Sequence, residues 1–204
     1  MAEITPKIRK NIQFALSVVH ERRPEAPWYG VWGPVLEQLT TPDDDLSVFA
    51  QPALQPEFTT RYRIPDFGIY EVMENLGTHE TTRQITVIME IKAPIAPHTP
   101  HDFRDDGNIG IFETAEEQLD LQAAYAFASA EGGGVLIGIV GVGCLWRWML
   151  YKAAAVVPVQ GWGEDDEAFI VRHLGGREVT SGLFYLGAED SSTELGRLRS
   201  LLEE

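Results

Sequence analysis

The segment Gln84-Ile85-Thr86-Val87-Ile88-Met89-Glu90-Ile91-Lys92 decides which fold this sequence can adopt. Its side chains alternate with the period of two that is typical of a β-strand. We expect one face to carry Ile85, Val87, Met89 and Ile91, and the other to carry Thr86, Ile88, Glu90 and Lys92. A glutamate and a lysine therefore point the same way at the end of a hydrophobic strand, which Pro94 terminates.

Another acidic residue, Asp66, follows Pro65 in a hairpin-like segment about two dozen residues before Glu90. Two carboxylates and a lysine in this order are typical of a metal-dependent nuclease site. Phosphodiester hydrolysis needs Mg²⁺ or Mn²⁺, and these hard cations prefer oxygen ligands. Asp66 and Glu90 would bind the metal, with the backbone carbonyl of Ile91 as a third oxygen. Lys92 would orient the attacking water, help to deprotonate it, or neutralise charge on the phosphate.

Hydrophobic periodicity and turn residues predict the other elements of the chain. We expect helices at 6–22, 33–39, 114–130 and 192–202, and strands at 46–58, 60–73, 84–92, 135–141 and 145–151. Weaker patterns favour strands at 154–159, 168–173 and 183–186, and a loop covers 94–112. Thr114 and Glu117 form a capping box at the start of the third helix, and three glycines at 132–134 end it. This order predicts an α/β fold with a central mixed sheet flanked by helices.

The motif Pro65-Asp66 followed by Glu90-Ile91-Lys92 resembles the PD-(D/E)XK nuclease superfamily, which has a restriction-endonuclease-like fold with an α-β-β-β-α-β core. The resemblance covers residues 33–151 of a chain that we expect to form one domain over 1–204, with an N-terminal helix and an acidic C-terminal extension. It implies that a glutamate on the helix before the first core strand, here Glu37, completes the metal site. It also implies that a glutamine on the helix after the E-x-K strand, Gln118 or Gln122, lies near the site. Tyr125 follows Gln122 by three residues, whereas the RecB-like branch has four.

The function that these motifs predict is metal-dependent hydrolysis of DNA or RNA. The net charge of −15, from 31 acidic and 16 basic residues, opposes this prediction because phosphate backbones are bound mainly through Lys and Arg. Nucleic-acid chemistry would then rely on a local basic patch, a metal or a partner. One alternative is a non-catalytic interaction module with the same fold, and another is an α/β enzyme that acts on a small phosphorylated substrate.

The composition also bears on location and partners. The single cysteine, Cys144, excludes an intramolecular disulfide and favours a reducing, intracellular setting, in the cytoplasm or nucleus. The N-terminal residues show no signal peptide, and no hydrophobic run is long enough to span a membrane. The hydrophobic residues of 154–162 are compatible with a homodimer or a protein partner.

Several polar and aromatic residues allow more than one interpretation. His98, His101 and Asp102 could form a metal cluster, but a role in substrate binding fits their loop better, and Arg104 there could contact a phosphate. Arg61 and Arg63 are two apart and suit either phosphate binding or an ordinary surface. Three aromatic residues near the end of the sheet are expected in the core rather than as base-stacking platforms: Trp146, Trp148 and Tyr151. Glu90 with Lys92, and either glutamine, could also be simply solvated.

Overall fold

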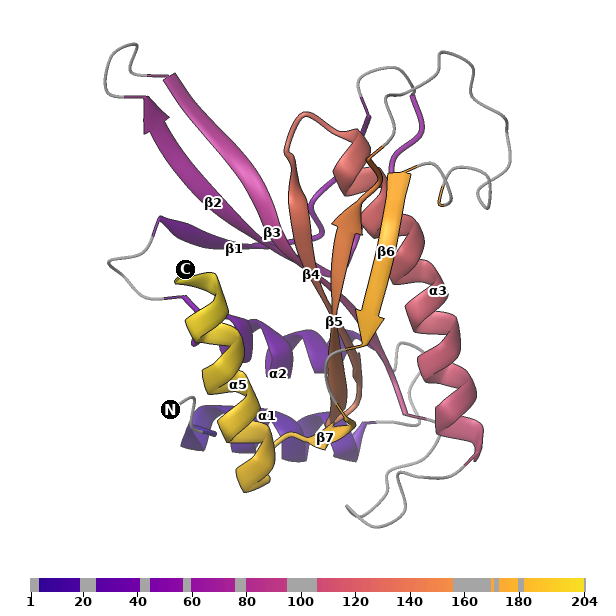
Figure 1. Cartoon of the computed structure of the whole chain (residues 1–204). Helices are drawn as coiled ribbons and strands as arrows, with labels where there is room; N and C mark the ends of the chain where they lie inside the picture. Colours follow the sequence, from indigo (N-terminus) through magenta and orange to yellow (C-terminus); the bar gives the residue numbers. More distant parts are fainter. Residues whose placement is uncertain are drawn as a thin grey trace.

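The computed structural model describes residues 4–18, 25–40, 45–56, 60–75, 80–94, 106–155, 170, 173–179 and 182–203. These residues form an α/β structure with a mixed, open central sheet flanked by helices, which confirms the predicted class (Figure 1). The helices are α1 (Pro6–Ser17), α2 (Ala26–Leu36), α3 (Asp106–Ala128) and α5 (Glu189–Leu202). The strands are β1 (Leu46–Ala50), β2 (Phe67–Asn75), β3 (Glu80–Lys92), β4 (Gly132–Val142), β5 (Leu145–Ala153), β6 (Leu174–Val179) and β7 (Phe184–Tyr185).

The strands are ordered β1-β2-β3-β4-β5-β6, and β7 pairs with β5 beyond this path. β1, β2 and β3 form an antiparallel meander, whereas β3 and β4 are parallel. A parallel pair needs a crossover connection, and α3 supplies it. β5 then returns antiparallel to β4 and pairs with β6. The polar end of β3 therefore lies inside the sheet, with Glu90 opposite Val140 and Lys92 opposite Val142.

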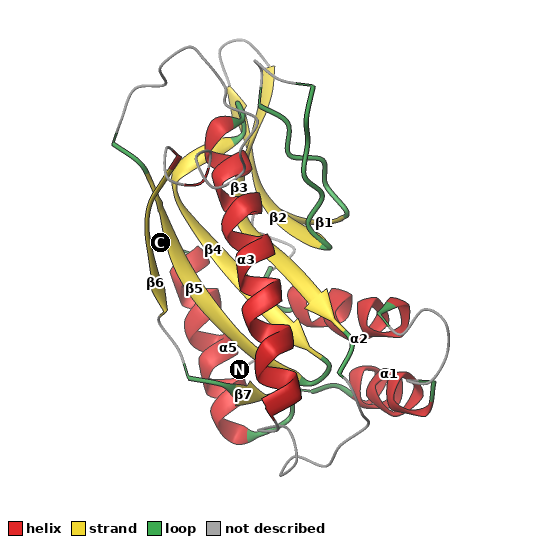
Figure 2. Ribbon diagram, turned by 90° about the vertical axis from the view of Figure 1, so that its right-hand side faces the viewer, coloured by secondary structure: helices red, strands yellow, loops and turns green. Residues whose placement is uncertain are grey.

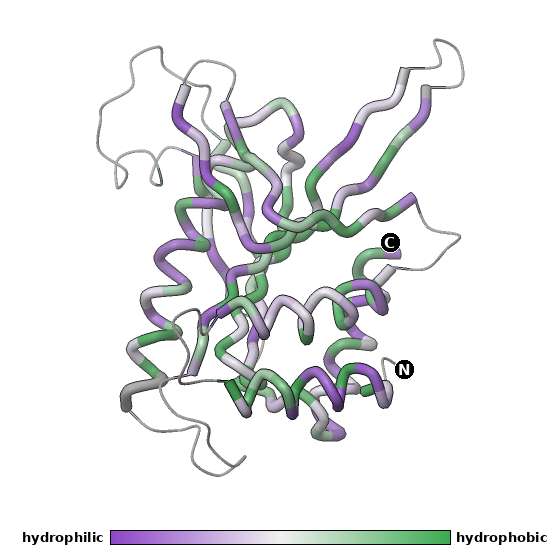
Figure 3. The backbone as a smooth tube through the Cα atoms, turned by 180° about the vertical axis from the view of Figure 1, so that it is seen from behind, coloured by the Kyte–Doolittle hydropathy of each residue, from purple (hydrophilic) through white to green (hydrophobic). Residues whose placement is uncertain are grey.

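Two hydrophobic cores lie on opposite faces of the sheet. Helix α3 covers one face, and α1, α2 and α5 cover the other (Figure 2). Val87, Met89 and Ile91 of β3 belong to the core with α1, α2 and α5, whereas Ile88 belongs to the core with α3. Hydrophobic residues concentrate where the strands cross the middle of the molecule (Figure 3). The sheet is buried on both faces, so the end of β3 that carries Glu90 lies between two helical layers.

A β-bulge changes the predicted face of one residue. Ile85 was expected beside Val87, but it belongs to the core with α3. The pairing of β3 is irregular between Ile85 and Val87, and the partner strand shifts between Ile69 and Tyr70. An extra residue in one strand reverses the side-chain alternation on its far side. The predicted alternation therefore holds from Thr86 to Lys92.

Both N-terminal helix predictions have wrong boundaries. Helix α1 ends at Ser17 rather than at residue 22, although residues 19–24 are outside the described part. The second helix was expected at 33–39 but spans Ala26–Leu36. Pro27 lies in the first turn of α2, where a missing N–H group costs little.

The start of the long helix was also predicted too late. Thr114 is not a cap but an internal residue of α3, and its hydroxyl donates a hydrogen bond to the carbonyl of Gly110 at 3.0 Å. The helix begins at Asp106, in a segment that was expected to be a loop. The three glycines at 132–134 open β4 instead of ending the helix, which stops at Ala128.

The remaining differences concern short or irregular strands. The strand expected at 60–73 begins only at Phe67, and β1 is shorter than the segment 46–58. β6 was not predicted, because two glycines interrupt its pattern. β7 occupies part of 183–186, and α5 begins three residues earlier than expected. The strands expected at 154–159 and 168–173 fall largely outside the described residues.

Candidate functional site

The carboxylate of Asp66 is fixed beside the end of β3. The backbone N–H of Ile91 donates a hydrogen bond to Oδ2 of Asp66 at 2.6 Å. The backbone of Asp66 is held as well, since its N–H donates to the carbonyl of Met89 and its own carbonyl accepts from Gln51. The side chain of Asp66 therefore accepts a hydrogen bond from the backbone of β3, which places it next to Glu90.

Glu90 is buried and both of its carboxylate oxygens accept hydrogen bonds. Oε1 accepts from Nζ of Lys92 at 2.7 Å, so the glutamate and the lysine share one side of β3 as the strand pattern predicts. Oε2 accepts from Nε2 of Gln122 on α3 at 2.8 Å. The structure thus brings Asp66, Glu90, Lys92 and Gln122 into one connected group.

The charges in this group shift two pKa values in ways that bear on their roles. Burial raises the pKa of Glu90, and the nearby charge of Asp66 raises it further, while Lys92 and Gln122 act in the opposite direction. Burial alone would lower the pKa of Lys92, but its hydrogen bond to Glu90 and the surrounding carboxylates outweigh burial and raise this pKa. Lys92 is therefore a cation at neutral pH. It suits charge stabilisation and positioning of a water, but not proton abstraction.

Tyr29 of α2 and Glu25, the residue immediately before α2, belong to the group and were not predicted. The hydroxyl of Tyr29 donates a hydrogen bond to Oδ1 of Asp66 at 2.5 Å, and its ring packs edge-on against Phe67 at 5.7 Å. Burial and the hydrogen bond to Asp66 raise the pKa of Tyr29, so its hydroxyl stays protonated and remains a donor. Oε1 of Glu25 lies 4.0 Å from Nζ of Lys92. The helical spacing of hydrophobic residues after Glu25 is the signal that could have placed this helix: Trp28, Val31, Trp32, Val35 and Leu36.

Glu37 and Gln118 are placed away from the centre of this group. Glu37 is exposed at the C-terminal end of α2, about 18 Å along the helix from Glu25. Of the two glutamates that flank α2, Glu25 and not Glu37 lies beside Lys92. Gln118 is exposed one turn before the buried Gln122. Of the two glutamines, the structure joins Gln122 to Glu90.

The residues present fit a hard divalent cation in chemistry and in charge. Carboxylates of Glu25, Asp66 and Glu90 surround the single ammonium of Lys92, so the group carries an excess of negative charge. Each carboxylate oxygen has a second lone pair beyond the hydrogen bond it accepts. Oε1 of Gln122 is buried and has no hydrogen-bond partner among the described residues, so it is a further oxygen acceptor. Among the described residues, including those of this group, no three His, Cys, Asp or Glu side chains are already positioned to bind one metal ion together.

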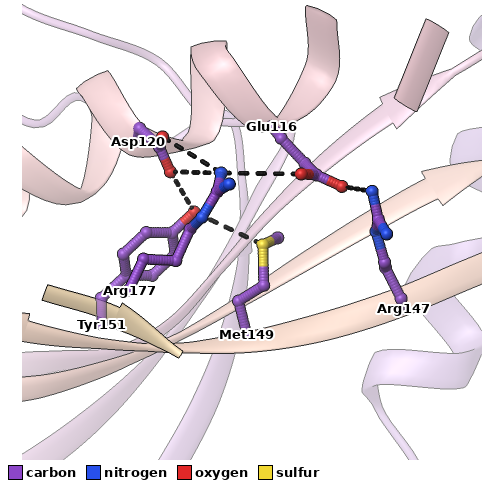
Figure 4. Close-up of polar contacts among 6 residues, drawn as sticks. All are labelled: Glu116, Asp120, Arg147, Met149, Tyr151 and Arg177. Atoms are coloured by element: carbon purple, nitrogen blue, oxygen red, sulfur yellow. Dashed lines mark hydrogen bonds and ion pairs between the residues drawn. The ribbon is translucent and has the colours of Figure 1, made fainter. Parts of the chain in front are cut away.

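A second polar cluster lies on the N-terminal side of Gln122 in α3, where the helix packs on β5 and β6 (Figure 4). Glu116 forms an ion pair with Arg147, and its other oxygen lies 3.5 Å from Nη1 of Arg177. Asp120 accepts hydrogen bonds from Arg177 at 3.1 Å and from the hydroxyl of Tyr151 at 2.7 Å. Two acids and two arginines balance, so this cluster fixes α3 to the sheet and offers no net charge to a ligand.

The other residues singled out in the sequence fall into two groups. Trp146, Trp148 and Tyr151 are buried, which confirms that they belong to the core. Cys144 is buried as well, and burial raises its pKa to about 12, so it is not a nucleophile at neutral pH. His98, His101, Asp102 and Arg104 lie outside the described residues.

Comparison of the chain with protein-family models, with curated proteins and with solved structures finds no match. Within the described residues, no helix combines the length and the hydrophobicity that crossing a membrane requires.

Proposed function

We propose that this protein is a metal-dependent phosphodiesterase that hydrolyses DNA or RNA. The observation that carries the proposal is the hydrogen-bonded group of Asp66, Glu90 and Lys92 at the end of β3. The order of elements around it, α2-β1-β2-β3-α3-β4, is the order that a restriction-endonuclease-like core would have, and it supports the resemblance to the PD-(D/E)XK superfamily.

Each residue of the group has a role that follows from its contacts. A bound Mg²⁺ or Mn²⁺ would supply charge stabilisation at the phosphate and a water of lowered pKa. Asp66 and Glu90 would hold the metal, with Glu25 and the carbonyl of Ile91 as further oxygen ligands. Tyr29 and the N–H of Ile91 orient Asp66, and Gln122 orients Glu90. The cationic Lys92 would hold the attacking water and neutralise charge that develops on the phosphate.

The charge balance supports a metal as part of this function. Three carboxylates against one ammonium leave the group with two uncompensated negative charges, which would repel a phosphodiester. A divalent cation neutralises these two negative charges and can bind the phosphate of the substrate. Burial is the largest cause of the raised pKa of Glu90, and the charge of Asp66 adds to it, so a cation at this point would favour the ionised form.

The test is a cleavage assay on labelled single- and double-stranded DNA and RNA, with Mg²⁺, Mn²⁺ or EDTA. Cleavage that requires a divalent metal and is abolished by EDTA would support the proposal and identify the substrate class. Absence of cleavage for every substrate with both metals would contradict it.

A second candidate is an interaction module that has lost catalysis. The observation that favours it is that all four carboxylate oxygens of Asp66 and Glu90 already accept hydrogen bonds within the protein. This candidate requires that Mg²⁺ and Mn²⁺ leave the melting temperature unchanged, whereas a metal bound to the folded state must raise it.

A further inference from the structure

The segment that leads into Asp66 is held in an extended conformation. Leu54 and Arg63 exchange two backbone hydrogen bonds, at 2.8 and 3.0 Å. The N–H of Gln51 donates to the carbonyl of Asp66 at 2.9 Å, which continues the same antiparallel register. Residues 63–66 therefore run in extended conformation alongside residues 51–54. Together with residues 60–62 they form an arm that ends at the proposed metal ligand.

The two faces of the arm differ in their surroundings. Leu54 is completely buried in the core beside α3, and the guanidinium of Arg63 lies over the ring of Tyr125 on α3, 5.0 Å from its centroid. In an extended segment, side chains alternate between faces. Tyr62 and Ile64 therefore lie on the opposite face from Arg63, on the side that Asp66 also takes. Both are large and exposed, Tyr62 by 54% and Ile64 by 45%.

The geometry points to the exposed face of Tyr62 and Ile64 as the binding site for unpaired bases of a single nucleic-acid strand whose scissile phosphate lies at Asp66 and Glu90. This inference rests on the proposed function. Successive bases of a single strand stack on exposed aromatic side chains, and such stacking tolerates any sequence. Tyr62 lies about 13 Å of extended chain from Asp66, close enough for one strand to contact both.

The basic residues on either side of Tyr62 fit the same ligand. Arg61 and Arg63 are both adjacent to the tyrosine, in a chain whose net charge is −15. Arg63 also donates a hydrogen bond to the carbonyl of Tyr62 at 3.3 Å, which helps to hold the arm. By the same alternation, both arginines lie on the opposite face of the arm from the ring of Tyr62, so they make the local charge less negative without contacting the stacked bases.

The overall charge favours a single strand over a duplex. A duplex presents one phosphate charge per about 1.7 Å of its axis, and its bases are stacked and paired, so that they cannot reach Tyr62. A single strand has a lower charge density and unstacked bases. An acidic protein with one small basic segment is therefore repelled less strongly by a single strand than by a duplex.

The test is the binding of fluorescein-labelled oligothymidine, measured by fluorescence anisotropy with Ca²⁺ in place of Mg²⁺, beside a duplex of the same length. Tyr62→Ala is compared with Tyr62→Phe, which keeps the ring, and with Phe14→Ala, which removes an exposed ring from α1. We expect Tyr62→Ala to weaken single-strand binding about 5- to 100-fold, in line with the loss of one stacked base. Both other variants should stay within about two-fold of the wild type, and all should share its melting temperature.

Two results would overturn the inference while leaving the proposed function intact: wild-type cleavage with single-strand binding that Tyr62→Ala does not change, or tighter binding to the duplex. A wild type that neither binds nor cleaves any nucleic acid would instead overturn the proposed function. Binding of a protein at Tyr62 with no effect of the variant on oligothymidine would assign the arm to a different partner and would also overturn the inference.

Discussion

The hydroxyl group of Tyr29 donates a hydrogen bond to Oδ1 of Asp66 at 2.5 Å, and this contact ties helix α2 to the acidic end of the sheet. Tyr29→Phe removes the hydroxyl without changing the shape of the ring. Because hydrogen bonds to charged groups contribute about 1.5–3 kcal/mol, and this one is only partly buried, we expect about 1 kcal/mol loss in the free energy of unfolding. Urea denaturation measures this loss.

Tyr29→Phe should also weaken metal binding, because Asp66 loses one of the two groups that orient it. A titration of the variant with Mn²⁺ should need several-fold more metal than the wild type for half-maximal activity, an effect of the size seen for groups that orient metal ligands. Tyr151→Phe, which loses a hydroxyl hydrogen bond to Asp120 outside the site, serves as the control for a lost tyrosine hydroxyl. An unchanged metal requirement in Tyr29→Phe would show that Asp66 does not depend on this contact.

Gln122 should control the pH dependence of activity. Its hydrogen bond to Glu90 favours the ionised carboxylate, so Gln122→Ala should raise the pKa of Glu90 further above its ordinary value. If activity needs ionised Glu90, the acidic limb of the pH–rate profile moves to higher pH in this variant. Gln118→Ala, one turn away on the exposed face of α3, should leave the profile unchanged. Identical profiles for both variants and the wild type would contradict the assigned role of Gln122.

Glu90 should also make the effect of a metal on stability depend on pH. Its pKa is raised in the folded state, so its favourable contribution to stability is present below the unfolded pKa and is lost as pH rises through the folded pKa. Metal binding needs the ionised form of Glu90. It therefore offsets this loss of stability above the folded pKa of Glu90 and not below it. At a metal concentration of about 100 times the dissociation constant, we expect about 2.7 kcal/mol of stabilisation.

For a chain of this size, that stabilisation corresponds to an increase of several degrees in melting temperature. Differential scanning fluorimetry with Mn²⁺ should show this shift above the folded pKa of Glu90 and little shift at pH values below it. A shift of equal size across the whole range would mean that the metal binds somewhere that does not include Glu90.

Removing Arg147 from its ion pair with the buried Glu116 should destabilise the protein (Figure 4). Glu116 is 7% exposed, and Arg147→Met leaves Arg177, 3.5 Å away, as its ion-pair partner among the described residues. We expect a loss of about 3 kcal/mol in the free energy of unfolding. The double variant with Glu116→Gln should lose less than Arg147→Met alone, since no buried charge is then unpaired. Additive losses in urea denaturation would show that the two residues are not coupled.

The sequence predicted the part of the site that depends on local strand geometry. Glu90 and Lys92 could be assigned to one face because alternation holds without interruption from Thr86 to Lys92. Ile85 could not be assigned correctly, since the bulge beside it depends on how β3 pairs with β2 and β4. Asp66 could be connected to Glu90 only through the motif, because no local pattern shows that two strand ends meet.

The helices show where sequence patterns were insufficient. The α2 contribution, Glu25 and Tyr29, was missed because Pro27 reads equally as the end of one helix or the first turn of the next. Glu37 was assigned from the resemblance, whereas the structure places Glu25 beside Lys92. Gln122 could not be separated from Gln118, since both are on one helix and only the packing of α3 on the sheet buries one of them.

The measurement that tests the central claim most directly is the rate of metal-dependent cleavage of labelled DNA and RNA by Lys92→Ala, beside Lys152→Ala, which removes an exposed lysine on β5. The loss of a cation that stabilises developing charge typically lowers the rate by about two to three orders of magnitude, and we expect this for Lys92→Ala, with a normal rate for Lys152→Ala. Equal cleavage rates for the wild type and both variants would contradict the assignment of the group of Asp66, Glu90 and Lys92 as the catalytic site.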